Sequence, residues 1–348
     1  MSPGIALLTP ASAPAGQGNA VTVDRLVRGL SARGVEARVW DLSASAEPDV
    51  LASILAARPC LVHVFHAYRA GPLALEAARR LAVPLVVTLT GTDANHDLVE
   101  PGSGATVARV LTAAAAVTVF HRSITARLAD ALAEVVPRVA EIPQAVAFAR
   151  TDPVDLAALW RLPSDRLLVL FPGSIRRVKR PLLALRGLEP VAARHPRLKL
   201  AYAGPVLEAA EGDALLGALR SRPWARHLGT VPHTQMASLL AQADIVVNSS
   251  VSEGGMANAV LEALALGRAV LASAIDGNRS LIEHDVTGLL FTDQDDLTTQ
   301  AERLVTDPDL RARLGAAGRT RIERDHPPSR EIDAYLTLYR SLVALPLP

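Results

Sequence analysis

Two glutamates, Glu253 and Glu262, bracket a loop of small residues in the segment 248–262, which reads NSSVSEGGMANAVLE. An apolar run at 245–247 precedes this loop, and the residues after it continue at the spacing of a helix. We therefore expect a strand, a tight loop and a helix N-terminus, whose free N–H groups suit an anion. Carboxylates repel bare phosphate but accept hydrogen bonds from sugar hydroxyls, so the pair favours a sugar joined to phosphate. The alternative is an ordinary strand-to-helix turn with two solvated acids.

A cluster of cations follows another apolar run, where residues 171–180 read FPGSIRRVKR. Three arginines and Lys179 occupy four of the five positions 176–180, and cations this close repel one another unless an anion lies between them. Diphosphate is the natural candidate. Only Lys179 and Lys199 are lysines in this chain, so a lysine kept at 179 favours a site that needs a compact charge. The alternative is a solvated basic loop.

Polar residues also follow apolar runs in the first half of the chain. Loops after the strands of an open parallel sheet hold its ligands, so we expect these residues to line an acceptor side. They are His66, Tyr68, Arg69, Thr90, Thr92 and Asp93. His63 lies inside its run and is expected to be a packed core histidine. Gly18 and Asn19 end a small-residue loop that could approach phosphate, but a Gly-x-Gly-x-x-Gly fingerprint is absent, which argues against a nicotinamide enzyme.

Apolar runs alternate with amphipathic helical stretches along the chain, which predicts an α/β protein with parallel sheets covered on both faces. Strands are expected at 5–8, 37–40, 61–65, 85–89, 117–120, 167–171, 198–203, 245–247 and 269–272, and helices at 21–33, 73–81, 181–194, 236–242 and 332–345. The proline-containing stretch 146–164 interrupts this alternation and suggests a linker. We therefore expect domains at 1–150 and 165–322, followed by a helical segment at 323–348.

The composition excludes several classes of protein. The 348 residues are 50% apolar with a net charge of +1, and no basic block points to nucleic acid or a membrane surface. No apolar run is long enough to span a bilayer, so we expect a cytoplasmic protein with small-molecule partners. Cys60, the only cysteine, is expected in the core. No metal site is expected, because Asp93, Asp97, Asp295 and Asp296 sit where capping residues are common.

Taken together, these motifs resemble a known family. The two α/β halves, the basic glycine loop, the two glutamates and VTGLLF at 286–291 resemble the retaining nucleotide-sugar glycosyltransferases of family 4, which have the GT-B fold. The segments FHAYRAG, TGTDANHD, IRRVKRP and NSSVSEGG resemble the glycosyltransferase 1 domain-containing protein 1 subgroup. LTGTD, EGG and the IDGN at 275–278 are similar to the selenosugar synthase of selenoneine biosynthesis.

The resemblance implies two Rossmann-like domains facing a central cleft, with the C-terminal helix crossing back to the first domain. It implies that Lys179 contacts the donor diphosphate, that Glu262 holds the ribose, and that Glu253 and nearby N–H groups meet the sugar and its phosphate. His66, Lys179 and Glu253 are then the catalytic candidates. The donor side comprises Gly18, Asn19, Gly173, Arg176, Arg177, Lys179, Glu253, Gly254, Gly255, Met256, Ala257, Asn258 and Glu262.

Three positions depart from the family pattern. Ser174 stands where an arginine is usual, so Arg176 or Arg177 must supply the second cation. The glutamates are nine positions apart, one more than usual, which requires a bulge or a shifted helix start. Thr90 stands where a histidine is common, which leaves His66 as its replacement.

The sequence thus leads us to expect a metal-independent, retaining glycosyltransferase that moves a hexosyl or N-acetylhexosaminyl group from a UDP-sugar to a small-molecule acceptor. The nucleotide-sugar is a co-substrate, and no other cofactor is expected. Three alternatives stay open: a selenosugar- or thiosugar-forming synthase that uses a UDP-sugar, a nucleotide-sugar epimerase or hydrolase, and a degenerate UDP-sugar-binding protein.

Overall fold

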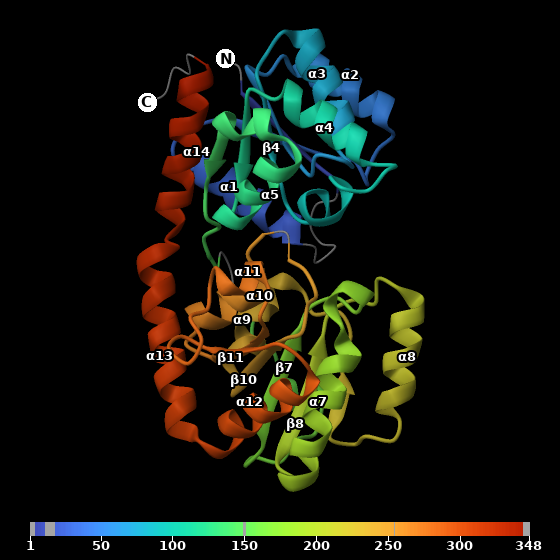
Figure 1. Ribbon diagram of the computed structural model, residues 1–348, viewed down its shortest axis with the longest axis vertical. Coiled ribbons are helices and arrows are strands. Elements are labelled where there is room, and N and C mark those ends of the chain that lie inside the picture. The colour runs from blue at the N-terminus through green and yellow to red at the C-terminus, as the bar shows by residue number, and fades with distance from the viewer. Residues whose placement is uncertain (1–3, 11–17, 149–150, 254, 344–348) are drawn as a thin grey trace. The chain divides into compact units, whose positions relative to one another are not determined.

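The computed structural model describes residues 4–10, 18–148, 151–253 and 255–343 (Figure 1). The chain divides into two compact units. The first unit comprises the residues up to Ala145 together with those from Pro327 onward, and the second unit comprises Val146–His326. The first boundary falls at the start of the stretch expected as a linker, and the second lies four residues beyond residue 322.

The first unit contains a six-stranded parallel sheet in the order β2-β1-β3-β4-β5-β6. Its strands are β1 (Ile5–Thr9), β2 (Ala37–Asp41), β3 (Leu61–Phe65), β4 (Leu85–Thr88), β5 (Ala116–Val119) and β6 (Val139–Glu141). Its helices are α1 (Gly18–Ser31), α2 (Glu47–Ala57), α3 (Gly71–Leu81), η1 (Asp93–Asp97), α4 (Gly104–Ala113), α5 (Arg122–Ala131), η2 (Ala133–Arg138) and α14 (Pro328–Leu342). The expected α/β architecture is confirmed here.

Alternate residues of these strands face two separate cores, because successive side chains of a strand point to opposite faces of the sheet. Leu8, Val64 and Val87 pack with α2, α3 and α4 on one face. Leu7 and Phe65 pack with α1 and α14 on the other face. Both faces of the sheet are therefore buried, as a parallel sheet requires.

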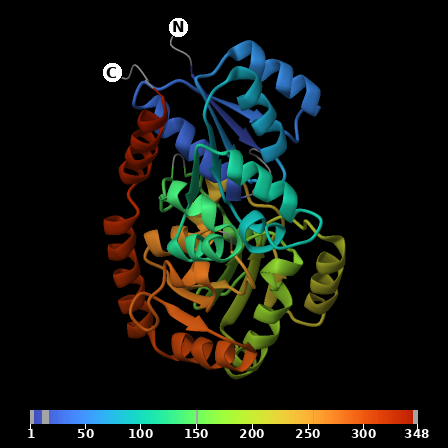
Figure 2. The same cartoon turned by 45° about the horizontal axis from the view of Figure 1, so that its top comes forward.

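The last helix, α14, belongs to the first unit and lies beside α1 (Figures 1 and 2). Arg25 of α1 forms a bidentate ion pair with Glu331 of α14, with N–O distances of 2.6 and 2.9 Å, and both side chains are buried. A buried pair of this kind is costly to break on one side only, because an unpaired charge would remain. Tyr335 and Tyr339 of α14 complete the core around β3.

The second unit contains another six-stranded parallel sheet, in the order β12-β11-β10-β7-β8-β9. Its strands are β7 (Leu167–Pro172), β8 (Leu198–Ala203), β9 (Ala225–His227), β10 (Ile245–Asn248), β11 (Ala269–Ser273) and β12 (Leu289–Phe291). Its helices are α6 (Leu156–Leu159), η3 (Arg177–Lys179), α7 (Pro181–Arg194), α8 (Ala209–Leu219), α9 (His233–Ala241), α10 (Asn258–Ala265), α11 (Asp276–Arg279), α12 (Gln294–Thr306) and α13 (Pro308–Asp325).

The strand order places the candidate segments at one particular point of each sheet. In the second unit, β7 pairs with β8 on one side and β10 on the other, so the loops after β7 and β10 start side by side. In the first unit, β1 and β3 hold the same position. Such a switch point, at the carboxyl ends of the strands, is where open α/β sheets bind ligands.

Asp152 and Val154 lie in the part of the expected linker that the structure describes, and both contact the second unit. The backbone N–H of Asp152 donates to Thr234 O at 2.8 Å, and that of Val154 donates to Ser238 Oγ at 3.0 Å, so these two residues contact α9 of their own unit. Among the described residues, no helix is long and apolar enough to cross a membrane.

Candidate active site

The loops after β7 and β10 meet through an ion pair between Lys179 Nζ and Glu253 Oε1. The same carboxylate oxygen accepts from Ser250 Oγ at 2.7 Å and from Asn248 Nδ2 at 3.3 Å. Side-chain exposure is 16% for Lys179 and 13% for Glu253, so both charges lie mostly out of water. Glu253 therefore joins the basic loop to the end of β10.

Opposing effects set the pKa of Glu253. Burial raises it, but the Lys179 ammonium and the hydrogen bonds from Ser250 and Asn248 outweigh burial and hold the pKa below its usual value. Glu253 is therefore a carboxylate at neutral pH. It can accept hydrogen bonds from a sugar, and it cannot act as a general acid.

Ser249 holds the basic loop through contacts with the backbone of Lys179 and with Arg180. Its Oγ lies 2.9 Å from the carbonyl oxygens of both Lys179 and Arg180, and Arg180 Nε donates back to Ser249 O at 2.9 Å. Val251 N also donates to Val178 O at 2.9 Å. These contacts follow from the pairing of β7 with β10, which starts both loops at neighbouring strand ends.

The four cations of the basic loop do not converge on one point. Lys179 pairs with Glu253, Arg180 turns back to a backbone carbonyl, and Arg177 is exposed, with its own N–H donating to Glu208 at 2.8 Å. Three of the four cations thus have separate partners within the protein. Arg176 differs from the others, because its buried Nε has no hydrogen-bond partner among the described residues. Of the two arginines expected to replace the one missing at Ser174, Arg176 is therefore the one with a donor left for a ligand.

Glu262 is paired as well, with a residue that the sequence did not single out. His233 Nε2 lies 2.8 Å from Glu262 Oε1, and the side chains are 42% and 8% exposed. His233 opens α9 and Glu262 lies in the second turn of α10, so two neighbouring helices build this pair. α10 begins at Asn258, so Glu253 lies five residues before the helix and Glu262 lies within it. Gly254, expected in the donor loop, lies outside the described residues.

The IDGN segment at 275–278 supports the glutamate loop. A Cβ on Gly277 would lie 2.6 Å from Gly255 O and 2.8 Å from Glu253 Cβ, so only glycine allows this approach. The fully buried Asn278 donates to Ser273 O at 2.9 Å. Met256 and Ala257 are buried just before α10. A similar close approach occurs at Gly204, where a Cβ would lie 2.2 Å from Gly173 O.

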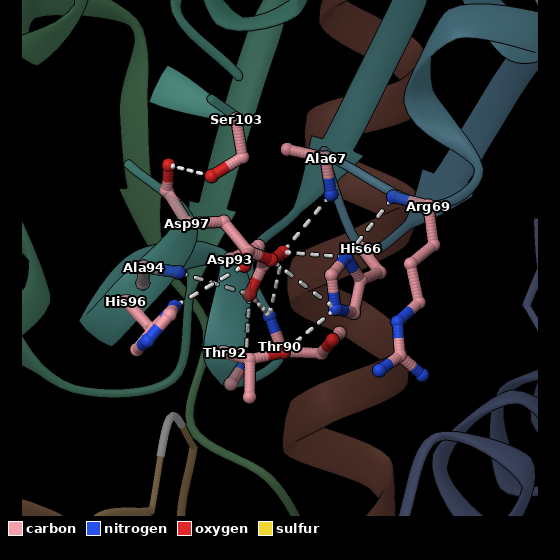
Figure 3. A network of polar contacts seen from close by, with 11 residues as sticks. His66, Ala67, Arg69, Thr90, Thr92, Asp93, Ala94, His96, Asp97 and Ser103 are labelled. Atoms are coloured by element: carbon pink, nitrogen blue, oxygen red, sulfur yellow. Dashed lines mark hydrogen bonds and ion pairs between the residues drawn. The ribbon is translucent and has the colours of Figure 1, made fainter. Parts of the chain in front are cut away.

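In the first unit, Asp93 fixes the loop after β4 (Figure 3). Its carboxylate accepts from the backbone N–H of Ala67 at 2.9 Å, Thr90 at 3.0 Å, Gly91 at 2.7 Å and Ala94 at 3.1 Å. Asp93 is fully buried, so it holds backbone in place and offers no oxygen to an acceptor. Its expected place on the acceptor side is corrected to this positioning role.

His66 lies beside this carboxylate in an unusual backbone conformation. Its φ of +84° falls in the region that side chains other than glycine rarely adopt, a strain that must be offset by surrounding contacts. Nδ1 accepts from Arg69 N at 3.3 Å, so Nε2 carries the proton in the neutral ring and donates to Thr92 Oγ1 at 2.9 Å. The side chain is 5% exposed. His66 therefore sits behind Thr92, which is exposed.

The other residues expected on the acceptor side fall into two groups. Tyr68 and Arg69 are exposed directly after β3, whereas Thr90 Oγ1 is buried and lacks a partner among the described residues.

Gly18 and Asn19, expected on the donor side, begin α1, and the residues before them, 11–17, lie outside the described part.

His63 is fully buried, and both ring nitrogens are hydrogen-bonded, to Tyr339 Oη and Thr88 Oγ1 at 2.6 Å each. Burial lowers the pKa of His63 to about 3. The expectation of a core histidine is confirmed. Cys60, expected in the core, is only partly buried against it, and burial raises the pKa of its thiol.

Two of the four acidic residues considered as metal ligands, Asp93 and Asp296, accept hydrogen bonds from the protein through their carboxylates. Asp296 accepts from Thr292 N at 2.9 Å and from Gln300 Nε2 at 2.9 Å. Within the described ranges, no three His, Cys, Asp or Glu side chains come together as a metal ion would require.

Comparisons with known proteins identify the fold and the family. The Anabaena protein HepE, in a crystal structure with UDP and glucose, matches with a TM-score of 0.79 at 16% identity, covering 97% of this chain and 100% of that one. Sucrose-phosphate synthase from Thermosynechococcus elongatus matches with a TM-score of 0.78 at 20% identity, covering 98% of this chain and 99% of that one. These matches confirm the GT-B fold.

Sequence comparison then gives the family. The profile of the glycosyl transferases group 1 matches residues 157–321. Glycosyltransferase 1 domain-containing protein 1 of Xenopus tropicalis is 28% identical over 267 residues, covering 75% of this chain and 77% of that protein. D-inositol 3-phosphate glycosyltransferase of Frankia alni is 31% identical over 298 residues, covering 78% and 73%. The chain belongs to the glycosyltransferases of group 1.

Proposed function

We propose that this protein transfers a sugar from a UDP-sugar to a small-molecule acceptor with retention of the anomeric configuration. The observation that carries the proposal is the placement of Lys179, Glu253 and Glu262 on adjoining loops and a helix at the switch point of the second sheet. The choice of UDP is supported by HepE, a protein of the same fold whose crystal structures contain UDP and UDP-glucose.

On the donor side, Glu262 would accept hydrogen bonds from the ribose hydroxyls and Glu253 from the sugar ring. The bond between the anomeric carbon and the diphosphate oxygen breaks during transfer, and negative charge grows on that oxygen. Lys179 and Arg176 would interact more strongly with the diphosphate in the transition state, where this charge has grown, than in the bound donor. Interactions that strengthen in the transition state accelerate a reaction. We propose that these two cations suffice without a metal ion.

On the acceptor side, the exposed Tyr68, Arg69 and Thr92 would contact the acceptor. His66 would act through Thr92, since its Nε2–H donates to that hydroxyl. The acceptor attacks from the same face as the departing diphosphate, and its proton passes to a diphosphate oxygen. His66 therefore need not accept a proton, which agrees with an Nδ1 already held by a backbone N–H.

One observation favours a rival function. Lys179 already has a carboxylate partner, so diphosphate must compete with Glu253 for the ammonium. A binding protein with a degenerate site would show UDP affinity without turnover.

Product analysis separates the proposals. A panel of nucleotide-sugars is incubated with the protein and a small-molecule extract, in EDTA and again with magnesium, and products are identified by mass spectrometry. We expect a glycoside formed from a UDP-sugar in EDTA. Free sugar or an epimerised donor would indicate a hydrolase or epimerase, and a product only with a selenium or sulfur nucleophile would indicate a selenosugar or thiosugar synthase. UDP binding without any product would contradict the proposal, and a requirement for magnesium would contradict leaving-group stabilisation by Lys179 and Arg176.

A further inference from the structure

A pocket opens at the amino ends of the strands of the second unit. Its volume is about 500 Å³, within the usual range of small-molecule sites of roughly 300–1,000 Å³. It adjoins Leu167 and Leu198, the first residues of β7 and β8, and Asp244, which precedes β10. Lys179 and Glu253 follow the carboxyl ends of the same strands, so this amino-edge pocket lies at the opposite edge of the sheet from the candidate donor site.

Cations dominate the lining of the amino-edge pocket. Arg166, the pair Arg194 and Arg197, and Arg311 reach it from three separate segments, together with His195 and the carboxylate of Asp244. Asp244 Oδ2 accepts from Leu168 N at 2.7 Å. Two neighbouring acids offset part of the charge: Glu302 pairs with Arg194 at 2.8 Å and His195 at 2.7 Å, and Asp165 with Arg197 at 3.2 Å. Four guanidinium groups against three carboxylates still leave an excess positive charge.

Arg166 is the residue of this pocket that lacks a hydrogen-bond acceptor for its Nε in the described part of the chain. Its Nε is buried and has no hydrogen-bond partner among the described residues, and the side chain lines the pocket. A buried donor without an acceptor destabilises the fold, and a ligand that supplies the acceptor removes this cost. Arg311 is different, since it donates to the carbonyls at the end of α12.

We propose that the amino-edge pocket binds a small multivalent oxyanion, phosphoryl or carboxylate, whose oxygen accepts from Arg166. Planar guanidinium groups match such oxygens in pairs, and the pocket supplies several of them around a small volume. The site is separate from sugar transfer and does not depend on the proposed function.

The test uses inorganic pyrophosphate as the probe, and calorimetry measures its binding. Lys179→Ala serves as the background, so that any binding at the proposed donor site is weakened. We expect binding to persist in Lys179→Ala and to weaken by roughly tenfold or more when Arg166→Gln is added, the loss expected for a charge-assisted hydrogen bond. Citrate, measured in parallel, distinguishes a carboxylate ligand from a phosphoryl ligand.

Two controls separate a built site from diffuse charge and from misfolding. Arg186→Gln changes an exposed arginine of α7 that does not line the pocket, and it should leave binding unchanged. Without ligand, Arg166→Gln should have a melting temperature no lower than that of its parent, Lys179→Ala, because the Nε of Arg166 has no partner to lose among the described residues. With pyrophosphate, the variant should lack the stabilisation that the parent gains. The proposal is overturned if neither anion binds Lys179→Ala at millimolar concentration, if Arg166→Gln binds as the parent does, or if Arg186→Gln weakens binding equally.

Discussion

His233 Nε2 lies 2.8 Å from Glu262 Oε1, so the first residue of α9 holds a carboxylate of α10. Glu262 is the residue proposed to bind the ribose, and its side chain is only 8% exposed. His233 therefore limits the directions in which Glu262 can present its second oxygen. In the proposed donor site, this contact would make His233 a positioning residue for the nucleotide.

We expect His233→Ala to weaken UDP binding by roughly threefold to tenfold, because one hydrogen bond that orients Glu262 is lost. His233→Gln, which keeps a neutral donor, should recover part of the affinity. Calorimetry with UDP measures both variants. A dissociation constant unchanged in His233→Ala would show that Glu262 needs no such support.

The two glutamates should divide the donor between them. Glu262→Ala should weaken binding of UDP itself by roughly tenfold, since the ribose loses its acceptor. Glu253→Ala should weaken the intact UDP-sugar without weakening UDP, because its proposed partner is the sugar ring and its removal frees Lys179 for the diphosphate. Titrations with both ligands decide the matter, and equal losses for both variants would refute this division.

His66 should affect transfer more than donor binding. Turnover depends on holding the acceptor close to the anomeric carbon, so losing the support of Thr92 should lower turnover by roughly tenfold to a hundredfold and leave the UDP dissociation constant unchanged. Two substitutions separate the imidazole from the backbone. His66→Gly accepts a φ of +84° freely, whereas His66→Ala does not. Equal losses of turnover in both would assign the effect to the side chain; wild-type turnover in His66→Gly would assign it to the backbone.

The buried His63 should make the protein sensitive to acid. The pKa of His63 is about 3 in the folded protein and about 6.5 in an unfolded chain. Between these two pH values the unfolded state binds a proton at His63, whereas the folded state does not. This difference destabilises the fold by about 2 kcal/mol between pH 7 and pH 5. Urea unfolding of the wild type and of His63→Gln measures it. The substitution should reduce the loss between the two pH values, and an identical loss in both proteins would contradict the assignment.

Much of the fold follows from local pattern. Longer buried strands, such as Leu198–Ala203, contain an apolar run that predicts a strand directly. The helix expected at 181–194 has the bounds Pro181–Arg194 in the structure. The three-residue strands β6, β9 and β12 were not expected as strands. Ala225–His227 shows why, because so short a segment has no period and pairs only through its place beside β8.

The candidate site was predictable only in part. Lys179 and Glu253 stood out by type and by position after apolar runs, but their ion pair depends on β7 lying beside β10, although 74 residues separate them in sequence. His233 gave no signal, because a single histidine before a helix has no motif. Asp93 was recognised as polar, yet its burial among four backbone N–H groups is a property of the folded loop.

Turnover of Lys179→Ala tests the central claim most directly, namely that Lys179 stabilises the diphosphate leaving group. The variant should lose a charge-assisted contact worth roughly 1.5–3 kcal/mol, and its turnover with a UDP-sugar should fall by roughly tenfold to a hundredfold. Lys179→Arg should recover little, because a planar fork does not replace a compact ammonium. Lys199→Ala removes the other lysine, which only donates to Pro196 O at 2.7 Å, and should transfer sugar at the wild-type rate. Near wild-type donor affinity and turnover in Lys179→Ala would contradict the account.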